Sequence, residues 1–581
     1  MKLAEYASQD ALGLAALVAS NQVSPTELAA TAVSAIAAIN PAINAVVETY
    51  PDRIGTLDER SLGGGPFRGV PFLMKDVFGH EAGRKIEFGS RLCRGMIAQQ
   101  DTHYCELIRA AGVNILGRSA APEYSMSGTA EGALYGNTCT PWRAGYSAGG
   151  STGGGMAAVI AGIVPIAHGS DIGGSIRIPA SYCGGVGLKP SRGRVSFGPM
   201  LDELGYGLAQ NFVQVKSVRD AAAMLDCLAV PQPGDPFLIP KPAETYAALI
   251  RRKPARLRIG WSTDALMGMN TDADVASAVA NVARVLADMG HDVSEESPQF
   301  DGLDAMRSMM DIWFFGFDLR LAGYARRSGH AIGTDTLEPV TFAIYEHARR
   351  MKPEQFLNAM AYVNTARRKL AAYFTRYDVW LSPTTPRVSE PWGNYNLGRT
   401  DVTFEELPEK IYRGVCQFTL PYNIMGTPAI SLPLAMHPNG LPIGIQLGTR
   451  PADEHVVLQL AAALEQALLD GTAAGVTCIA GHLRLLPASP FAQCRVPLFP
   501  GALAFTDTAS TDKVKVRCSF GFIAPTPMSL WAISSPRSLR IDTTTVYSQG
   551  SPSAGCRMLP SMRSGVSAGG WGASTPASKR R

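Results

Sequence analysis

Two glycine-rich turns decide how this chain is read. The first reads Gly145-Tyr-Ser-Ala-Gly-Gly-Ser-Thr-Gly-Gly-Gly155, and the second reads His168-Gly-Ser-Asp-Ile-Gly-Gly-Ser-Ile-Arg177. The apolar segment Met156–Ala167 lies between them, and we predict that it forms one short buried helix. Each turn carries a serine beside glycines, whose missing Cβ lets backbone N–H groups come close to a reacting atom. The pattern therefore favours a site of chemistry built around one helix.

Three other interpretations explain only part of this pattern. A phosphate loop needs the pattern G-x-x-x-x-G-K-[ST], and no lysine follows the first glycine cluster. A flexible Ser-Gly linker does not lead directly into an apolar segment. The nucleophile-elbow pattern G-x-S-x-G is met by Gly145-Tyr-Ser-Ala-Gly149, but so short a match is weak evidence in a glycine-rich stretch.

Taken together, the two turns resemble the signature sequence of the amidase signature family. Further stretches resemble that family's lysine motif, connecting region and closing strands, in the same order: Gly69-Val-Pro-Phe-Leu-Met-Lys-Asp76, Gly117–Glu123 with Gly136–Trp142, and Gly426–Pro433 with Gly440–Gln446. The resemblance runs from about residue 5 to residue 468. Within the family, the sequence is most similar to the branch of bacterial amidases and nylon-oligomer 6-aminohexanoate cyclic-dimer hydrolases.

The resemblance implies a triad of serine, cis-serine and lysine. It places the nucleophile at Ser175, the bridging serine after a cis peptide bond at Ser151, and the base at Lys75. A serine hydroxyl is a weak nucleophile and needs an adjacent base. Lysine acts as a base only when it is neutral, and burial among apolar neighbours lowers its pKa. Ser151 would pass the proton between Lys75 and Ser175.

The same turn supplies groups for the oxyanion that forms when serine attacks a carbonyl. We expect the oxyanion hole at Ile172, Gly173 and Gly174, since consecutive backbone N–H groups are available there. Ile172 stands where many members of the family have threonine, a change that leaves a backbone oxyanion hole intact. Asp171 and Arg177 flank the turn, and we expect them to support it as a buried ion pair.

Three further residues invite a functional interpretation that the sequence does not favour. His168 is a candidate general base, but the family resemblance gives histidine no catalytic role. Cys183 lies near the nucleophile and is better explained as a small buried residue. Trp313 opens an aromatic run that is more typical of a core than of a substrate pocket.

Composition and the order of predicted elements indicate an α/β fold. The chain has 581 residues, of which 46% are apolar, so it is neither a disordered tail nor a disulfide miniprotein. We predict helices over 28–39, ending before Pro41, and over 272–289, strands over 257–261 and 377–383, and a helix-rich stretch over 303–375. The prediction is a single large amidase-signature domain, residues 1–468, with a mixed central β-sheet covered by helices on both faces.

Residues 469–581 form a different kind of segment. From residue 471 onward twelve lysines or arginines face three acidic residues, and Ser, Pro, Gly and Thr dominate. We predict a basic Ser/Pro/Gly-rich C-terminal tail that is disordered. A nucleic-acid or membrane-binding role is disfavoured because the basic residues are spread out, and an out-of-frame extension stays open as an alternative.

Charge, cysteines and the N-terminus restrict the partners. Fifty-three basic residues against 49 acidic ones give a net charge of +4, which makes no case for nucleic acid. Ten scattered cysteines imply neither a zinc site nor a disulfide framework. The first residues lack the basic region of a signal peptide, and the longest apolar run, Met156–Ala167, is about half of a membrane span, which predicts a cytoplasmic protein without membrane contact.

The predicted function is an amidase that works without metal or cofactor. It would hydrolyse the C–N bond of a small-molecule carboxamide through an acyl-serine intermediate, giving a carboxylic acid and an amine or ammonia. One alternative is an amidotransferase A-type subunit that releases ammonia from glutamine within a tRNA-dependent complex. Another is a binding protein that has lost activity, which the presence of all three triad residues disfavours. A homodimer stays open, and the substrate is not predicted.

Overall fold

The computed structural model describes residues 1–469. The predicted tail lies outside the described residues, apart from Leu469, the last residue of helix α16. Within residues 1–469 the helices are α1 (Leu3–Ser8), α2 (Ala11–Ala19), α3 (Pro25–Ile43), α4 (His103–Ala110), α5 (Gly153–Ile160), α6 (Arg177–Cys183), α7 (Val218–Leu228), α8 (Tyr246–Leu249), α9 (Ala273–Asp288), α10 (Gly302–Phe314), α11 (Phe317–Ser328), α12 (Pro339–Ala348), α13 (Pro353–Arg376), α14 (Arg413–Cys416), α15 (Leu420–Met425) and α16 (Glu454–Leu469).

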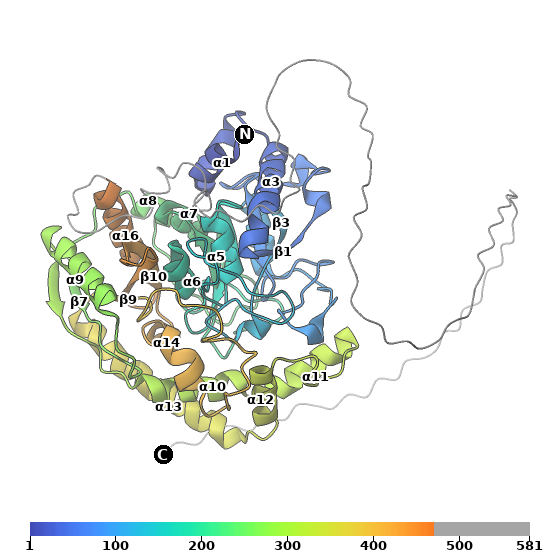
Figure 1. Cartoon of the computed structure of the whole chain (residues 1–581). Coiled ribbons are helices and arrows are strands. Elements are labelled where there is room, and N and C mark those ends of the chain that lie inside the picture. The colour runs from blue at the N-terminus through green and yellow to red at the C-terminus, as the bar shows by residue number, and fades with distance from the viewer. Residues whose placement is uncertain (470–581) are drawn as a thin grey trace, which may run out of the picture. The chain divides into compact units, whose positions relative to one another are not determined.

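One mixed sheet organises these helices (Figure 1). It contains eleven strands of the described chain, in the order β1-β3-β2-β4-β6-β5-β10-β11-β9-β7-β8. Their bounds are β1 (Val46–Thr49), β2 (Pro71–Lys75), β3 (Asn114–Ser119), β4 (Ile166–Asp171), β5 (Val186–Lys189), β6 (Gln210–Val215), β7 (Arg258–Trp261), β8 (Asp292–Glu295), β9 (Val379–Pro383), β10 (Ala429–Met436) and β11 (Pro442–Gly448). β2 pairs in parallel with β3 and β4, whereas β6 is antiparallel to both β4 and β5. The predicted mixed α/β fold is confirmed.

Helices cover both faces of the sheet, and strand β2 shows why. Its side chains alternate between the faces, as in any strand. Phe72 and Met74 belong to the core cluster that includes residues of α4 and α7, while Leu73 belongs to a second cluster built from α5 and α6. Lys75 comes two residues after Leu73 and therefore points to the α5 side. Strand periodicity thus sets the direction of the lysine before any polar contact is considered.

A helical layer formed by α10, α11, α12 and α13 lies along one side of the molecule, in yellow-green tones in Figure 1. Its buried residues form a further core cluster with α14 and α15, which includes Met309 and Trp313. The helix-rich stretch predicted over 303–375 is confirmed. This layer supplies walls to the cavities described below.

Two predicted helix bounds are wrong. Helix α3 continues through Pro41 to Ile43, and Pro41 is tolerated because it lies in the last turn. The helix ends at its C-cap, Asn44, which adopts the left-handed conformation at φ 50°. The apolar segment Met156–Ala167 is not one helix. α5 ends at Ile160, Gly162 adopts φ 81°, and β4 begins at Ile166, so the apolar composition serves a buried helix and then a buried strand.

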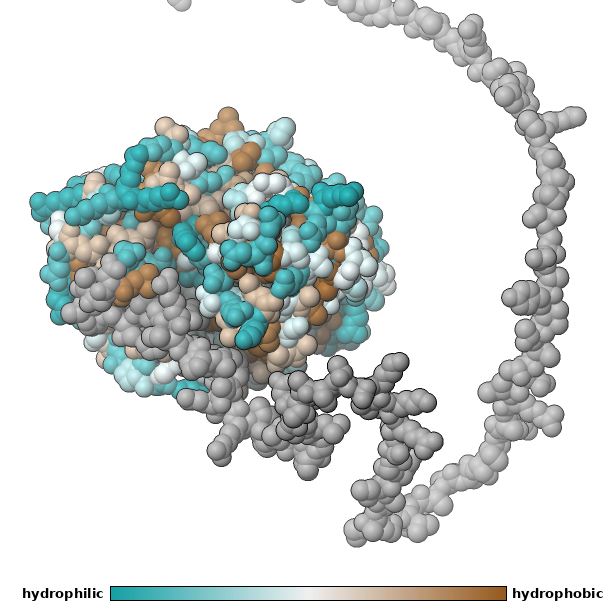
Figure 2. Space-filling model, turned by 90° about the horizontal axis from the view of Figure 1, so that it is seen from above, coloured by the Kyte–Doolittle hydropathy of each residue, from teal (hydrophilic) through white to brown (hydrophobic). Residues whose placement is uncertain are grey.

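Within the described residues, α3 is the one helix long and apolar enough to cross a membrane. This criterion considers only length and composition, and a helix in the core of a folded domain also meets it. Leu28, Ala29 and Ala32 of α3 are fully buried in the core cluster that contains α4 and α7. On the face drawn in Figure 2, hydrophilic and hydrophobic residues are interspersed. Packing within the fold therefore buries one face of α3, with 33% of its apolar window buried.

Candidate active site

Lys75 lies at the end of β2 and is completely buried. Its Nζ donates to three hydroxyl oxygens, at 2.8 Å to Oγ of Ser151, 3.0 Å to Oγ1 of Thr152 and 2.9 Å to Oγ of Ser170. The hydroxyls come from the turn before α5 and from β4, the neighbour of β2 in the sheet. Three neutral hydroxyls replace the carboxylate that a buried ammonium group normally requires.

Burial lowers the pKa of Lys75 well below its ordinary value, and the negative charge of Asp171 opposes this only in part. The amine is therefore stabilised in its neutral form, which carries two N–H donors and one lone pair. In that form, one of the three contacts at Nζ reverses, and a hydroxyl donates to the nitrogen. The site is thus arranged for proton transfer between an amine and a serine.

The two serines of the turns lie beside the same small cavity. The peptide bond between Gly150 and Ser151 is cis. Ser151, Ser170 and Ser175 line a cavity of about 10 Å³, which is close to the space that one water molecule needs. Among residues 1–469, the Oγ of Ser175 has no hydrogen-bond partner, whereas its carbonyl oxygen accepts from the N–H of Thr152 at 3.3 Å. The structure brings Lys75 and Ser151 into contact and leaves the Ser175 hydroxyl open to the cavity.

The glycine turn after β4 presents two free backbone donors. Among the described residues, the N–H groups of Ile172 and Gly173 have no acceptor. The N–H of Gly174 instead donates to Oδ1 of Asp171 at 2.9 Å. Gly174 has φ +137°, and an added Cβ would lie 2.4 Å from Oγ1 of Thr419. Of the three expected oxyanion donors, Gly174 thus serves the shape of the turn, and Ile172 and Gly173 keep their N–H groups available.

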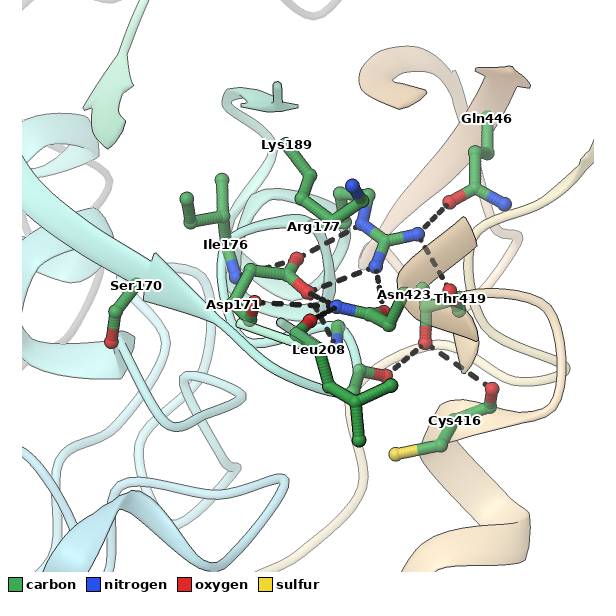
Figure 3. Close-up of polar contacts among 12 residues, drawn as sticks. Ser170, Asp171, Ile176, Arg177, Lys189, Leu208, Cys416, Thr419, Asn423 and Gln446 are labelled. Atoms are coloured by element: carbon green, nitrogen blue, oxygen red, sulfur yellow. Dashed lines mark hydrogen bonds and ion pairs between the residues drawn. The ribbon is translucent and has the colours of Figure 1, made fainter. Parts of the chain in front are cut away.

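A buried ion pair holds this turn (Figure 3). Asp171 and Arg177 are fully buried, and both Nε and Nη2 of Arg177 donate to the Asp171 carboxylate at 2.9 Å. Burial raises the pKa of Asp171, but the charge and hydrogen bonds of Arg177 outweigh it and hold the pKa below its ordinary value. Arg177 also donates to Oε1 of Gln446 at 2.8 Å and to Oδ1 of Asn423 at 2.7 Å. The pair therefore ties the turn to β11 and α15.

We expect Arg177→Leu to lower the free energy of unfolding by about 3–5 kcal/mol, because it leaves the Asp171 carboxylate buried without its partner. Equilibrium urea unfolding followed by tryptophan fluorescence measures the change. The matched control is Arg219→Leu, which breaks an ion pair to Asp10 at a side chain that is 57% exposed. That variant should lose less than about 1 kcal/mol. Equal losses in the two variants would contradict the supporting role of the buried pair.

His168 and Cys183 take no part in this arrangement. The imidazole of His168 is buried against the ring of Tyr104, with 4.4 Å between centroids, and its Nε2 lies 3.3 Å from Oδ1 of Asn211. Burial is the main cause that lowers the pKa of His168, to about 3. Cys183 is buried, and its Sγ contacts the carbonyl oxygen of Ala148. Among residues 1–469, His168 thus lacks the carboxylate partner of a catalytic histidine.

Trp313 is buried in a core cluster, as predicted, and it also borders three cavities. It lines the small cavity beside Ser175, a second small cavity beside Gly173, and a chamber of about 320 Å³. Phe78 and Leu204 also line both the cavity at Ser175 and the chamber. The three spaces share walls, so the chamber lies next to the small cavity that Ser175 lines. Its volume lies within the range of small-molecule sites.

Sequence reasoning missed several residues of the site. Thr152 and Ser170 contact Lys75 directly, and each stands next to a residue that was singled out, Ser151 and Asp171. The missing signal is three-dimensional, since only the pairing of β2 with β4 brings Ser170 to the lysine. Asn423 is separated from Asp171 by 252 residues and reaches it through α15. The spacing of Asp171 and Asn423 in the sequence gives no indication of this contact.

A buried lysine among serines, beside a turn with free backbone donors, is typical of hydrolases that attack a carbonyl carbon with a serine. Comparison with known families specifies the class. The Amidase family matches residues 27–458, and the chain belongs to this family. The protein is an amidase, a hydrolase that acts on carbon–nitrogen bonds. The prediction made from the two turns and the lysine motif is confirmed at this level.

Individual relatives agree with the family. The chain is 36% identical over 477 residues to the 6-aminohexanoate-cyclic-dimer hydrolase of Paenarthrobacter ureafaciens, an alignment that covers 79% of this chain and 95% of the relative. A solved structure of 6-aminohexanoate cyclic dimer hydrolase complexed with substrate superposes with a TM-score of 0.75 at 33% identity, over 80% of this chain and 97% of the other. The A-type subunit of the glutamyl-tRNA(Gln) amidotransferase of Acidothermus cellulolyticus is 31% identical over 507 residues, which cover 81% of this chain and 96% of that protein.

Proposed function

We propose that the protein hydrolyses a small-molecule carboxamide through an acyl-enzyme on Ser175, with Ser151 as the proton relay and Lys75 as the base, in the cytoplasm. The observation that carries the proposal is the 2.8 Å contact between the buried Nζ of Lys75 and Oγ of Ser151. Burial favours the neutral amine, and a neutral amine can accept a proton.

The first half of the reaction forms the acyl-enzyme. Ser175 Oγ attacks the amide carbon and passes its proton to Ser151, whose own proton moves to Lys75. The N–H groups of Ile172 and Gly173 donate to the oxygen that becomes negative. The proton then returns from Lys75 through Ser151 to the amide nitrogen, the C–N bond breaks, and the amine leaves. The acyl group stays bound to Ser175 as an ester.

The second half releases the acid by the same route. A water molecule attacks the ester carbon and gives its proton to Ser151, while the proton of Ser151 moves to Lys75. The C–O bond to Ser175 breaks, and Ser175 recovers a proton through Ser151. Every proton that leaves a hydroxyl has thus returned when the acid departs, and Lys75 is neutral again.

The amidotransferase alternative fits the cavity less well. A glutamine side chain is short and polar, whereas the chamber next to the Ser175 cavity has walls from aromatic residues such as Phe88, Tyr124 and Tyr324. We therefore expect the purified chain to act without partners on amides larger and more apolar than glutamine.

A panel of amides tests the proposed function. It should include glutamine, short aliphatic primary amides, anilides and the cyclic dimer of 6-aminohexanoate, with release of ammonia or amine as the readout. We expect hydrolysis of at least one apolar amide by the chain alone, and kcat/KM for glutamine at least about 100-fold lower than for that amide. Release of ammonia from glutamine only, or no hydrolysis anywhere in the panel, would overturn the proposal.

We further propose that residues 1–468 form the amidase unit. The family match ends at residue 458, and α16 buries Val457, Leu458 and Leu464 in the core. A chain that ends at Ala480 should therefore keep kcat/KM within about twofold of the full chain and Tm within about 3 °C. A chain that ends at Asp453 is the control, because it loses α16 and the Glu454 carboxylate that pairs with Arg194, and it should be insoluble. Loss of folding in the chain that ends at Ala480 would contradict this boundary.

A further inference from the structure

One face of helix α11 lines the chamber that lies next to the Ser175 cavity. Phe317, Arg320, Tyr324 and Arg327 follow one another at intervals of three or four residues and all border the chamber. This spacing places them on a single face of the helix. A face that packs into a core normally carries aliphatic residues, and here it carries two aromatic rings and two guanidinium groups. The composition is typical of a binding wall.

Aromatic rings from other segments pack against this face of α11. The ring of Tyr324 stacks on Phe88, with 4.8 Å between centroids, and on Tyr124, with 5.9 Å between centroids. The ring of Phe317 meets Tyr124 edge to face at 5.5 Å. Because these rings support one another, the chamber keeps a fixed and mainly apolar surface. A flat or extended apolar group fits such walls.

The two guanidinium groups lack ionic partners. Among residues 1–469, neither Arg320 nor Arg327 forms an ion pair with a carboxylate. Nη2 of Arg320 donates to the carbonyl oxygen of Trp313 at 2.6 Å, which leaves its Nε and Nη1 without an acceptor in the described chain. Burial lowers the pKa of Arg320, and Asp318 acts on it only from beyond ion-pair distance. A partly desolvated charge on a cavity wall recovers its lost hydration when an anion binds.

Other titratable groups at the chamber do not neutralise these arginines. Glu203 also lines the chamber, but among residues 1–469 it forms no ion pair with Arg320 or Arg327, and burial raises the pKa of its carboxyl group while the charge of Arg192 lowers it. Burial and the charge of Arg327 lower the pKa of His80 to about 4, so the imidazole is neutral at neutral pH. The α11 side of the chamber is therefore positive.

We propose that the amide cleaved by this enzyme carries a carboxylate at the far end of an apolar or aromatic group, and that Arg320, with Arg327 nearby, binds this carboxylate in the chamber. The inference rests on the proposed function, since the chamber shares Trp313, Phe78 and Leu204 with the small cavity that Ser175 lines. Arginine suits the task because its planar fork matches the two oxygens of a carboxylate. Arg320 is a specificity-determining residue in this account.

Binding of two matched ligands tests the proposal without any turnover. The probes are 4-phenylbutanoate and 5-phenylpentan-2-one, which differ in having a carboxylate or a methyl ketone at the same end. Isothermal titration calorimetry on the full chain measures both dissociation constants. We expect the acid to bind about 10-fold tighter than the ketone, as one charge-assisted pair predicts. Arg320→Met should weaken the acid about 10-fold and change the ketone by less than about twofold.

Two further variants control for the fold. Arg326→Met removes a neighbouring exposed arginine of α11 and should leave both constants unchanged. Arg320→Lys keeps the charge but not the fork, so it should retain only part of the preference and also serves if the methionine variant fails to fold. Equal affinity for acid and ketone, equal weakening of both by Arg320→Met, or no binding of either ligand at millimolar concentration would overturn the proposal. A chain that shows the preference but hydrolyses no amide would contradict the proposed function instead.

Discussion

Replacing Ser175 with alanine is expected to lower kcat/KM for amide hydrolysis by at least about 10⁴-fold, because the variant has no nucleophile to form the acyl-enzyme. The fold should be unaffected, since the Ser175 hydroxyl has no hydrogen-bond partner among residues 1–469 and its removal leaves no buried group unpaired. Kinetics with the best amide of the panel measure the loss. Circular dichroism and Tm verify that the variant is folded.

A matched serine separates the role of Ser175 from that of the cavity. Ser125 lines the same cavity, and its buried Oγ has no hydrogen-bond partner in the described chain. Ser125→Ala therefore removes an equal volume from the same wall and should reduce kcat/KM by less than about 10-fold. If the folded Ser175→Ala variant retains more than a few per cent of the activity, Ser175 is not the nucleophile.

The second large effect concerns pH and Lys75. Proton transfer from Ser151 needs the neutral amine, so kcat/KM should rise with pH through the pKa of Lys75 in the free enzyme and then level off. Burial lowers that pKa well below its ordinary value of about 10.4, so the rise should be complete well before pH 10. Measurement of kcat/KM from about pH 5 to pH 10 gives the profile.

Variants at two positions decide which group titrates. Lys75→Ala should remove the pH dependence together with at least about 10³-fold of the rate, and Lys75→Arg should not restore it, because a guanidinium group stays protonated. His168→Gln should leave the profile in place, since burial already keeps that imidazole neutral. A profile that His168→Gln abolishes and Lys75→Ala retains would transfer the role of base to the histidine.

The sequence predicted strands and helices correctly where the local sequence pattern and the tertiary packing favour the same structure. The strand predicted over 257–261 appears as β7, and the helix predicted over 272–289 appears as α9, which ends before Gly290. Prediction failed where one local signal competed with packing. Pro41 is tolerated because it lies in the last turn of α3, and the segment 156–167 is apolar in both its halves, so composition could not separate a helix from a strand.

The sequence motifs predicted which residues belong to the site, but they did not predict which of these residues contact one another. The glycine turns and the lysine motif identified the residues, but whether Lys75 meets Ser170 depends on the pairing of β2 with β4. The role of Gly174 also depends on the three-dimensional structure, because its N–H donates to Asp171 while, among residues 1–469, the N–H groups of Ile172 and Gly173 have no acceptor. The chamber could not be predicted from the sequence, because the residues that line it come from separate segments and the sequence around Trp313 is typical of a core.

Covalent labelling of the nucleophile tests the central claim most directly. A sulfonyl fluoride transfers its sulfonyl group to an activated serine, with loss of fluoride and of the hydroxyl proton. After reaction at pH 8, peptide mass spectrometry should locate one sulfonyl group on Ser175 in the wild type and in His168→Gln, and none in Lys75→Ala, whose serine is not activated. Cys416 lines the small cavity beside Gly173 and is the other nucleophile to consider. Labelling at Ser151 or Cys416 instead, or labelling of Ser175 at the wild-type rate in Lys75→Ala, would contradict the mechanism.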